Sequence, residues 1–228
     1  MPRYLLLLAL ACLPSLRAAP LPDYFNRALR AFGGDTPAGW AYTLTTTRGA
    51  ETTVERYDPG RPPAERWTLL QRDGRAPTAD EFHRYRSYKT AHSPVTPRPT
   101  FARGDIDLGS VRLEREDAET TVFHGRFRED LDDPLLANLE LRLTIAKSSA
   151  HIVRTELHLT NAYTPALSAR ILELSVIVTY TPPAPDRPAL PAASESRFRG
   201  RVFFFKSVAE DLRITYTDYT AAGRAISP

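Results

Sequence analysis

The sequence predicts a mainly β protein: a curved antiparallel sheet or incompletely closed barrel of about ten strands, with two covering helices. Two observations predict this fold. Apolar and polar residues alternate with a period of two over most of the chain, which is typical of strands that bury only one face. In the second half, such strands follow one another with no helix between them. Parallel neighbours would need long crossovers, so we expect antiparallel pairing.

Residues 1–18 are expected to form a signal peptide, because Arg3 is followed by an apolar run too short to span a bilayer as a helix. Cleavage after Ala18 leaves a single β domain, residues 19–228, which we expect in the periplasm. Cys12 is the only cysteine, and its surroundings loosely resemble a bacterial lipobox. Acylation of Cys12 is the alternative, and it would anchor the protein to a membrane. After ordinary cleavage the mature chain has no cysteine and therefore no disulfide.

The charge of the chain does not favour nucleic acid as a partner. The formal net charge of +3 includes two arginines of the predicted signal peptide, which holds no acidic residue, so its removal leaves 3 − 2 = +1. Acidic residues and arginines are interspersed along the chain, whereas nucleic-acid-binding proteins usually carry a one-sided basic surface.

An amphipathic helix is predicted over residues 22–33, where it would cover a sheet. Leu21, Phe25, Leu29 and Phe32 recur at helical spacing, and the next two residues are glycines that stop the helix.

Three short strands are predicted next. Apolar and polar residues alternate from Trp40, and Gly49 then turns the chain into a second strand over residues 52–57. Residues 58–63 contain three prolines and form a loop. A third strand follows over residues 67–71.

A second helix is predicted to begin after Thr78 and to run to about Lys89, because Thr78 and Glu81 form a capping-box pattern. Residues 93–100 contain three prolines and are interpreted as a linker or rigid crossing.

Seven further strands are predicted from alternation, and with the first three they make about ten. They cover residues 111–117, 120–128, 139–145, 153–159, 172–180, 198–206 and 212–216. Residues 182–191 hold five prolines, which cannot pair in a central sheet. We expect this segment to project from the sheet and to be more mobile than the strands beside it.

No catalytic residue, metal site or cofactor is expected. The five histidines show no metal-ligand spacing, and His151 and His158 should lie on opposite faces of one strand. The acidic segment 129–133 lacks the glycine and regular spacing of a calcium loop, so we interpret it as a solvated turn. No nucleophile elbow, phosphate loop or dinucleotide fingerprint occurs, which argues against an enzyme.

The aromatic residues supply the candidate ligand-binding site. Residues 203–205 are three phenylalanines in a row and would place rings on both faces of one strand. That is more apolar surface than a one-sided sheet needs. The rings either pack in a helix-covered core or line an apolar cavity between sheet and helices. The lining candidates are Trp40, Trp67, Phe123, Phe127, Phe203 and Phe205.

The segment from Thr52 to Tyr57, through Arg61-Pro62 to Arg66-Trp67, resembles the strand, Arg-Pro turn and Arg-Trp strand of the LolA and LolB lipoprotein-carrier superfamily. That resemblance covers about a fifth of the chain and implies a curved, incompletely closed barrel that holds lipid chains under its helices. The turn here is longer than in that family. Residues 58–78 also resemble uncharacterised proteobacterial exported proteins, which imply no function.

Three functional hypotheses follow. The first is a non-catalytic envelope protein that binds an apolar ligand, such as a lipid or a lipoprotein acyl chain, between sheet and helices. The second is a structural or regulatory module that presents sheet edges and proline-rich loops to an envelope protein partner. The third is an outer-membrane β-barrel, whose strands also alternate.

Overall fold

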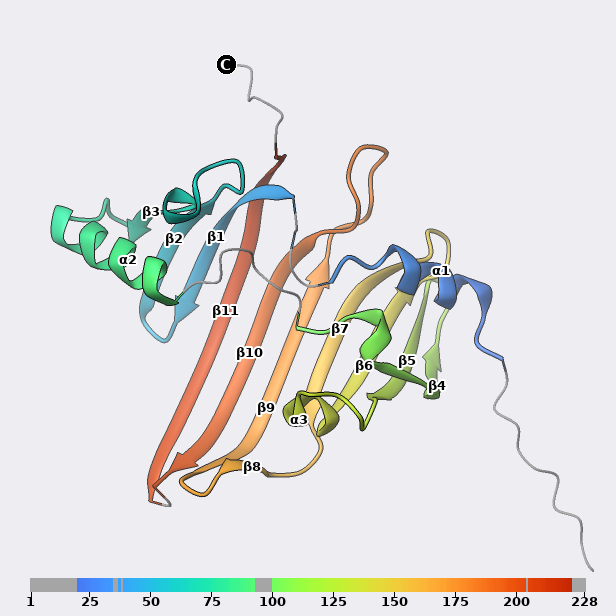
Figure 1. Ribbon diagram of the computed structural model, residues 1–228. Helices are drawn as coiled ribbons and strands as arrows, with labels where there is room; N and C mark the ends of the chain where they lie inside the picture. The colour runs from blue at the N-terminus through green and yellow to red at the C-terminus, as the bar shows by residue number, and fades with distance from the viewer. Residues whose placement is uncertain (1–19, 35–36, 38, 93–99, 204, 223–228) are drawn as a thin grey trace, which may run out of the picture.

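A single antiparallel sheet of eleven strands forms most of the protein in the computed structural model, which describes residues 20–34, 37, 39–92, 100–203 and 205–222 (Figure 1). The strands are β1 Trp40–Arg48, β2 Glu51–Tyr57, β3 Trp67–Arg72, β4 Ile106–Glu116, β5 Thr120–Phe127, β6 Leu139–Ala146, β7 His151–Leu159, β8 Tyr163–Ala166, β9 Ala169–Tyr180, β10 Pro191–Val202 and β11 Lys206–Ala221. The helices are α1 Asp23–Ala31, α2 Ala79–His92 and α3 Pro134–Ala137, with 3-10 turns at Pro63–Glu65 and Arg103–Asp105.

The strand order is β3-β2-β1-β11-β10-β9-β7-β6-β5-β4, and the short β8 pairs with β9. Every pairing is antiparallel, and the sheet is not closed into a barrel. The predicted class, a curved and incompletely closed antiparallel sheet, is confirmed. Because β1 pairs with β11, the first three strands continue the sheet beside the last strand of the chain.

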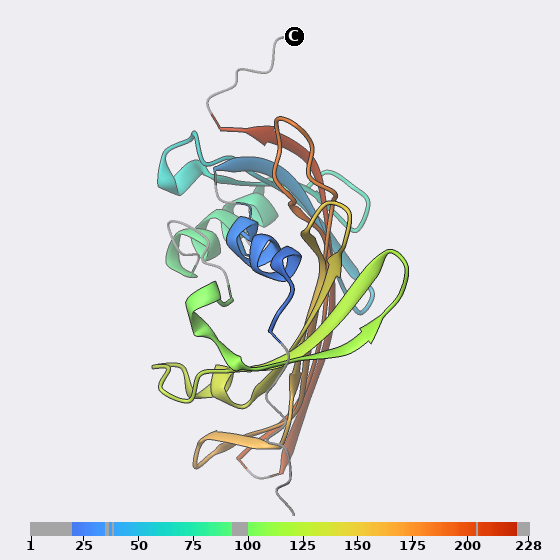
Figure 2. The same cartoon turned by 90° about the vertical axis from the view of Figure 1, so that its right-hand side faces the viewer.

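The sheet curves, and both long helices lie on its concave side (Figure 2). We call the face that carries Leu141 and Leu157 the concave face. Strand β6 shows the one-sided pattern most clearly, because its residues alternate without exception between buried and half-buried. Strand β11 alternates between exposed and half-buried residues from Ser207 to Thr217. The alternation therefore gives the sheet a more buried concave face and a more exposed convex face.

Helix α1 covers the concave face over β5, β6, β7 and β9. Its Phe25, Ala28 and Leu29 are fully buried and pack against the apolar residues of these strands. The predicted helix is confirmed at this position, and the chain leaves it through Phe32 and Gly34, whose φ of 90° suits glycine.

Helix α2 lies over the other end of the same face and packs on β3 (Figures 1 and 2). The predicted capping box is present: the backbone N–H of Glu81 donates to Thr78 Oγ1 at 3.3 Å, and the N–H of Thr78 donates to Glu81 Oε2 at 2.8 Å. Residues 93–99 of the predicted linker lie outside the described part of the chain.

Several register shifts interrupt the alternation, and those in β7 and β9 correct the sequence analysis. Thr144 pairs with Arg154 and Ile145 with Ile152, so Val153 is the extra residue and Ile152 takes the core-facing position. The prediction for His151 was wrong for this reason. The bulge shifts the phase of β7, and His151 and His158 lie on the same face, separated by about 23 Å of strand. In β9 the extra residue is Leu172, which is 41% exposed.

The boundaries of β10 also correct the sequence analysis. The strand begins at Pro191 rather than near residue 197, and it ends at Val202 rather than continuing to Lys206. Phe203 has a φ of 50°, a left-handed conformation that ends the strand and begins a tight turn into β11. Phe203 and Phe205 therefore lie at a turn and not on two faces of a strand.

The proline-rich connection between β9 and β10 projects beyond the sheet as predicted (Figure 1). Its base is held by two hydrogen bonds, in which the N–H of Thr181 donates to the Leu190 carbonyl and the N–H of Leu190 donates to Thr181 Oγ1. Its expected mobility stays a prediction. The remaining elements that the alternation did not predict are β8 and the one-turn helix α3, whose Asp133 cap accepts from Leu135 N and Leu136 N.

Candidate functional site

Two of the six candidate aromatics belong to the main core. Phe123 and Phe127 are each 2% exposed. The ring of Phe123 lies 4.6 Å from that of Phe25 on α1, and the ring of Phe127 lies 5.4 Å from that of Phe101. The sequence left a packed core and a cavity lining as alternatives, and these two residues belong to a packed core.

Two others, Trp40 and Trp67, lie in or beside a separate aromatic cluster near the other end of the sheet. The cluster centres on Tyr42, whose ring contacts the rings of Tyr57, Trp67, Tyr216 and Tyr219 at centroid distances of 5.1–6.3 Å. Trp40 packs edge-on against Tyr219. Burial raises the pKa of the Tyr42 phenol, so this hydroxyl stays protonated at physiological pH.

The last two candidates, Phe203 and Phe205, are not brought together with the others. They occupy the turn between β10 and β11 and are 62% and 85% exposed. Sequence reasoning placed them on a strand, because three consecutive phenylalanines have a high β propensity.

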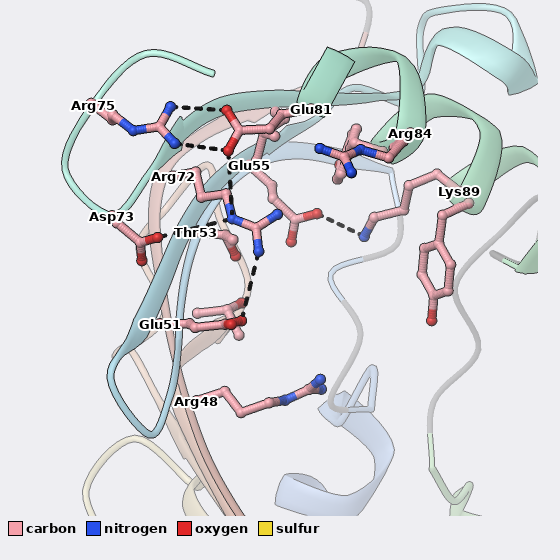
Figure 3. A pocket seen from close by; sticks show the side chains of 14 residues that line it. Arg48, Glu51, Thr53, Glu55, Arg72, Asp73, Arg75, Glu81, Arg84 and Lys89 are labelled. Carbon is pink, nitrogen blue, oxygen red and sulfur yellow. Dashed lines mark hydrogen bonds and ion pairs between the residues drawn. The ribbon is translucent and has the colours of Figure 1, made fainter. Parts of the chain in front are cut away.

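A cavity of about 800 Å³ lies beside the aromatic cluster, between α2 and the concave face of β1, β2 and β3 (Figure 3). It is open to solvent on one side and lined mainly by charged and hydroxyl-bearing side chains. The lining residues are Thr46, Arg48, Glu51, Thr53, Glu55, Leu69, Arg72, Asp73, Arg75, Glu81, Arg84, Tyr85, Tyr88 and Lys89.

The innermost feature of this cavity is an ion pair between sheet and helix. Glu55 on β2 is 8% exposed, and its Oε1 lies 2.8 Å from Lys89 Nζ on α2. The same ammonium group lies 4.1 Å from the centre of the Trp67 ring, in cation–π geometry. Lys89 therefore holds the end of α2 to the sheet through both a carboxylate and an aromatic face.

Tyr85 closes the cavity one helical turn earlier on α2. Burial raises the pKa of its phenol, and the nearby Glu55 carboxylate raises it further. The hydroxyl is shielded from solvent and does not reach hydrogen-bond geometry with any described residue.

A second charged group fixes the start of α2. Arg75 donates two hydrogen bonds to the Glu81 carboxylate, at 2.9 and 2.8 Å, and Arg72 lies 4.0 Å away from the same carboxylate. These bonds to Arg75, and next the backbone N–H of Thr78, hold the pKa of Glu81 at about 2.

Most cations of the cavity have an acidic partner. Arg48 pairs with Glu210, Arg72 with Glu51, Asp73 and Glu81, Arg75 with Glu81, and Lys89 with Glu55. Arg84 points toward the cavity without an ion pair to any described residue (Figure 3). The arrangement suits a polar or anionic group of a ligand, held by Arg84.

Sequence reasoning did not find this cavity, although one signal was present. Glu55 lies two residues before Tyr57 on the same strand, so alternation predicts that both side chains point toward the same apolar face. A carboxylate on a buried face needs a partner. Lys89 lies 34 positions further along the chain, on a helix whose placement over β2 no local pattern specifies.

Within the part of the chain that the structure describes, no group of three or more His, Cys, Asp or Glu side chains is arranged to hold a metal ion. No helix there is long and apolar enough to cross a membrane.

The depressed pKa of Glu81 predicts an acid-resistant start of α2. A carboxylate whose pKa is lower in the folded state stabilises the fold above its ordinary value near 4.5 and loses this contribution as the pH falls through about 2. We expect carboxyl NMR to show Glu81 titrating near 2, and Arg75→Gln to raise its pKa toward the ordinary value. Arg84→Gln is the control and should leave the Glu81 titration unchanged. A wild-type midpoint near 4.5 would contradict the capping network.

Lys89→Met should destabilise the protein by leaving Glu55 charged and without a partner. Loss of one partner from a fully buried pair costs about 3–5 kcal/mol, and the partial exposure of Lys89 reduces our expectation to roughly 2 kcal/mol. The double variant Glu55→Gln/Lys89→Met should recover much of this loss in chemical denaturation. Lys147→Met, which breaks the more exposed pair with Glu116, should cost less than about 1 kcal/mol. Equal losses of stability in Lys89→Met and Lys147→Met would contradict the buried pair of Glu55 and Lys89.

Comparison of the chain with known protein families, with characterised proteins and with solved structures finds no match.

Proposed function

We propose that the protein is a non-catalytic binding protein for an amphiphile such as a fatty acid or a lipid. Its apolar chain lies on the concave face between α1 and α2, and its polar head lies in the cavity under α2. The observation that carries this proposal is a change along the concave face, from polar and charged side chains on β1 and β2 to mostly apolar side chains beyond β10, with β10 and β11 left uncovered between the two helices.

The register of the sheet defines this path. One row of paired residues crosses it from the cavity to the core: Thr53, Thr46, Ile214, Ser194, Val178, Thr155 and Leu143. The next row is Glu51, Arg48, Leu212, Ser196, Val176, Leu157 and Leu141. In both rows the side chains on β1 and β2 are polar and line the cavity, while those beyond β10 are mostly apolar.

The middle of the path is only half-buried. Leu212 and Ile214 on β11, Ser194 and Ser196 on β10, and Val176 on β9 are all partly accessible. Helix α1 packs on β7 and helix α2 on β3, which leaves the middle strands between them. From β1 to β9 the half-buried path crosses three strand spacings, roughly 14 Å, a length that an extended acyl chain can cover.

The polar end of the path fits the head of an amphiphile. Arg84 supplies a cation without an ion-pair partner among the described residues. Nearby carboxylates neutralise the other cations of the cavity. The site therefore accommodates a ligand with one anionic group.

Export to the periplasm is part of the same proposal and rests on the N-terminal sequence, with lipidation of Cys12 as the alternative. Those residues lie outside the described part of the chain. The resemblance to the LolA and LolB carriers supports a lipid ligand, and it stays a prediction.

A charge placed on the path should abolish binding. Leu212→Glu puts a carboxylate on the half-buried concave face, whereas Thr215→Glu puts the same group on the exposed convex face of the same strand. We expect purified protein to bind a fluorescent fatty acid saturably, Leu212→Glu to weaken this binding at least tenfold, and Thr215→Glu to leave it unchanged. Absence of uptake by the wild type, together with adduct-free native mass spectra, would contradict the proposal.

The polar head has its own test. Arg84→Gln should weaken binding of palmitate several-fold but not binding of the uncharged hexadecanol, because only the carboxylate needs the guanidinium. Equal effects on both ligands would show that the head does not lie in the cavity.

A further inference from the structure

Two hairpin ends meet at one corner of the sheet. The turn between β8 and β9 and the turn between β10 and β11 lie side by side, because Phe203 N donates to the Ser168 carbonyl at 2.6 Å. In Figure 1 this corner is at the lower end of the long strands, opposite the proline-rich loop. We call it the hairpin tip and define it by residues 166–172 and 200–206, without residue 204.

Large apolar side chains gather at the hairpin tip. Leu167 is 91% exposed, Phe205 85%, Phe203 62% and Leu172 41%. Single exposed apolar residues are common on protein surfaces, whereas a group of them on adjoining turns marks a contact site or a membrane-binding site. None of these four side chains contributes to either core cluster.

Phe203 is also held in an unfavourable conformation. Its φ of 50° lies in the left-handed region, where glycine or asparagine is favoured and a bulky side chain is strained. A turn alone would be more stable with glycine at this position. A phenyl ring at this position therefore lowers the stability of the fold. This indicates that the ring has a role other than stabilising the structure.

The charge around these side chains has one sign. Residues 163–172 and 200–209 contain no acidic residue, and they contain Arg170, Arg201 and Lys206. Arg170 and Arg201 are direct partners across β9 and β10, a like-charge pairing that destabilises a sheet. Neither arginine, nor Lys206, forms an ion pair with a described residue, although the neighbouring Arg199 is held by Asp211. An anion at this corner would relieve the repulsion.

We propose that the hairpin tip inserts into the surface of a bilayer that contains anionic lipids. Leu167, Phe203 and Phe205 enter the boundary between headgroups and acyl chains. Arg170, Arg201 and Lys206 contact the lipid phosphates.

The shape of the site favours a lipid surface over a protein partner. A stable protein–protein interface buries about 800 Å² on each side, on a surface of matching shape. The tip is instead a narrow projection of two turns with a basic surround, and a fluid surface can accommodate such a projection without a complementary groove. This inference does not rest on the proposed ligand path, which lies between the helices at some distance along the strands.

Vesicle binding tests the apolar part. The mature chain from Ala19, which lacks both the apolar N-terminal run and Cys12, is floated with vesicles of phosphatidylcholine alone or with about a third phosphatidylglycerol. We expect binding to the anionic vesicles that falls with added salt, and little binding to phosphatidylcholine. Leu167→Ser/Phe205→Ser should reduce it at least tenfold. The matched control Leu108→Ser/Leu113→Ser removes two exposed apolar residues from β4 and should leave binding unchanged.

The charged part is tested by Arg170→Gln/Arg201→Gln, which should remove most of the preference for anionic vesicles. Arg27→Gln/Arg30→Gln on the exposed side of α1 is the matched control and should keep it. Circular dichroism verifies that each variant is folded. A Phe205→Trp variant should show a blue-shifted emission with anionic vesicles.

Three results would overturn the proposal. The first is no binding of the folded wild type to anionic vesicles. The second is equal loss of binding in the tip and control variants. The third is a self-associated wild type that becomes monomeric in sedimentation velocity when Leu167 and Phe205 are replaced, because the apolar tip would then be a contact between copies of the chain.

Discussion

A sheet that is apolar on one face only has to shield that face from water, and here eleven strands share one such face. Strands β5, β6, β7 and β9 are shielded by α1, through Phe25 and Leu29, and they form most of the larger core. Strands β1 to β3 are shielded differently, by a cluster of tyrosine and tryptophan rings and by α2. The two covered regions end on either side of β10 and β11, and there the concave face stays half-exposed. The location of the proposed ligand path follows from this division.

The two helices differ in what holds them. Helix α1 carries a strongly apolar side and is anchored by burial, whereas α2 is polar on all sides and is anchored by ion pairs and its cap. Its start is fixed by Arg75 and Glu81, and its other end by Lys89 on Glu55 and Trp67. A helix held in this way encloses a solvent-accessible cavity instead of a dry core. Charged side chains therefore line the space beneath α2.

The sequence predicted the features that depend on local patterns. Alternation located most strands, and the Thr78 and Glu81 pair located the start of α2. It failed where the backbone departs from regular pairing: the bulge at Val153, the start of β10 at Pro191, and the left-handed Phe203 that turns a presumed strand into a hairpin end. Among the six candidate aromatics, Phe123 is buried and Phe205 is exposed. This difference comes from the position of each residue in the fold and not from its residue type. The Glu55–Lys89 pair joins distant segments, and such contacts are set by tertiary packing.

We propose that the concave face of β11 is accessible and that a ligand covers it. Cysteine scanning tests this directly, because residues 19–228 contain no cysteine. Single cysteines replace Val208, Leu212 and Ile214 on the concave face, and Ala209, Arg213 and Thr215 on the convex face. Each is labelled with a water-soluble maleimide. We expect all six to react and palmitate to slow labelling at Leu212 and Ile214 but at none of the convex positions. Unreactive concave cysteines, or labelling that palmitate does not change, would contradict it.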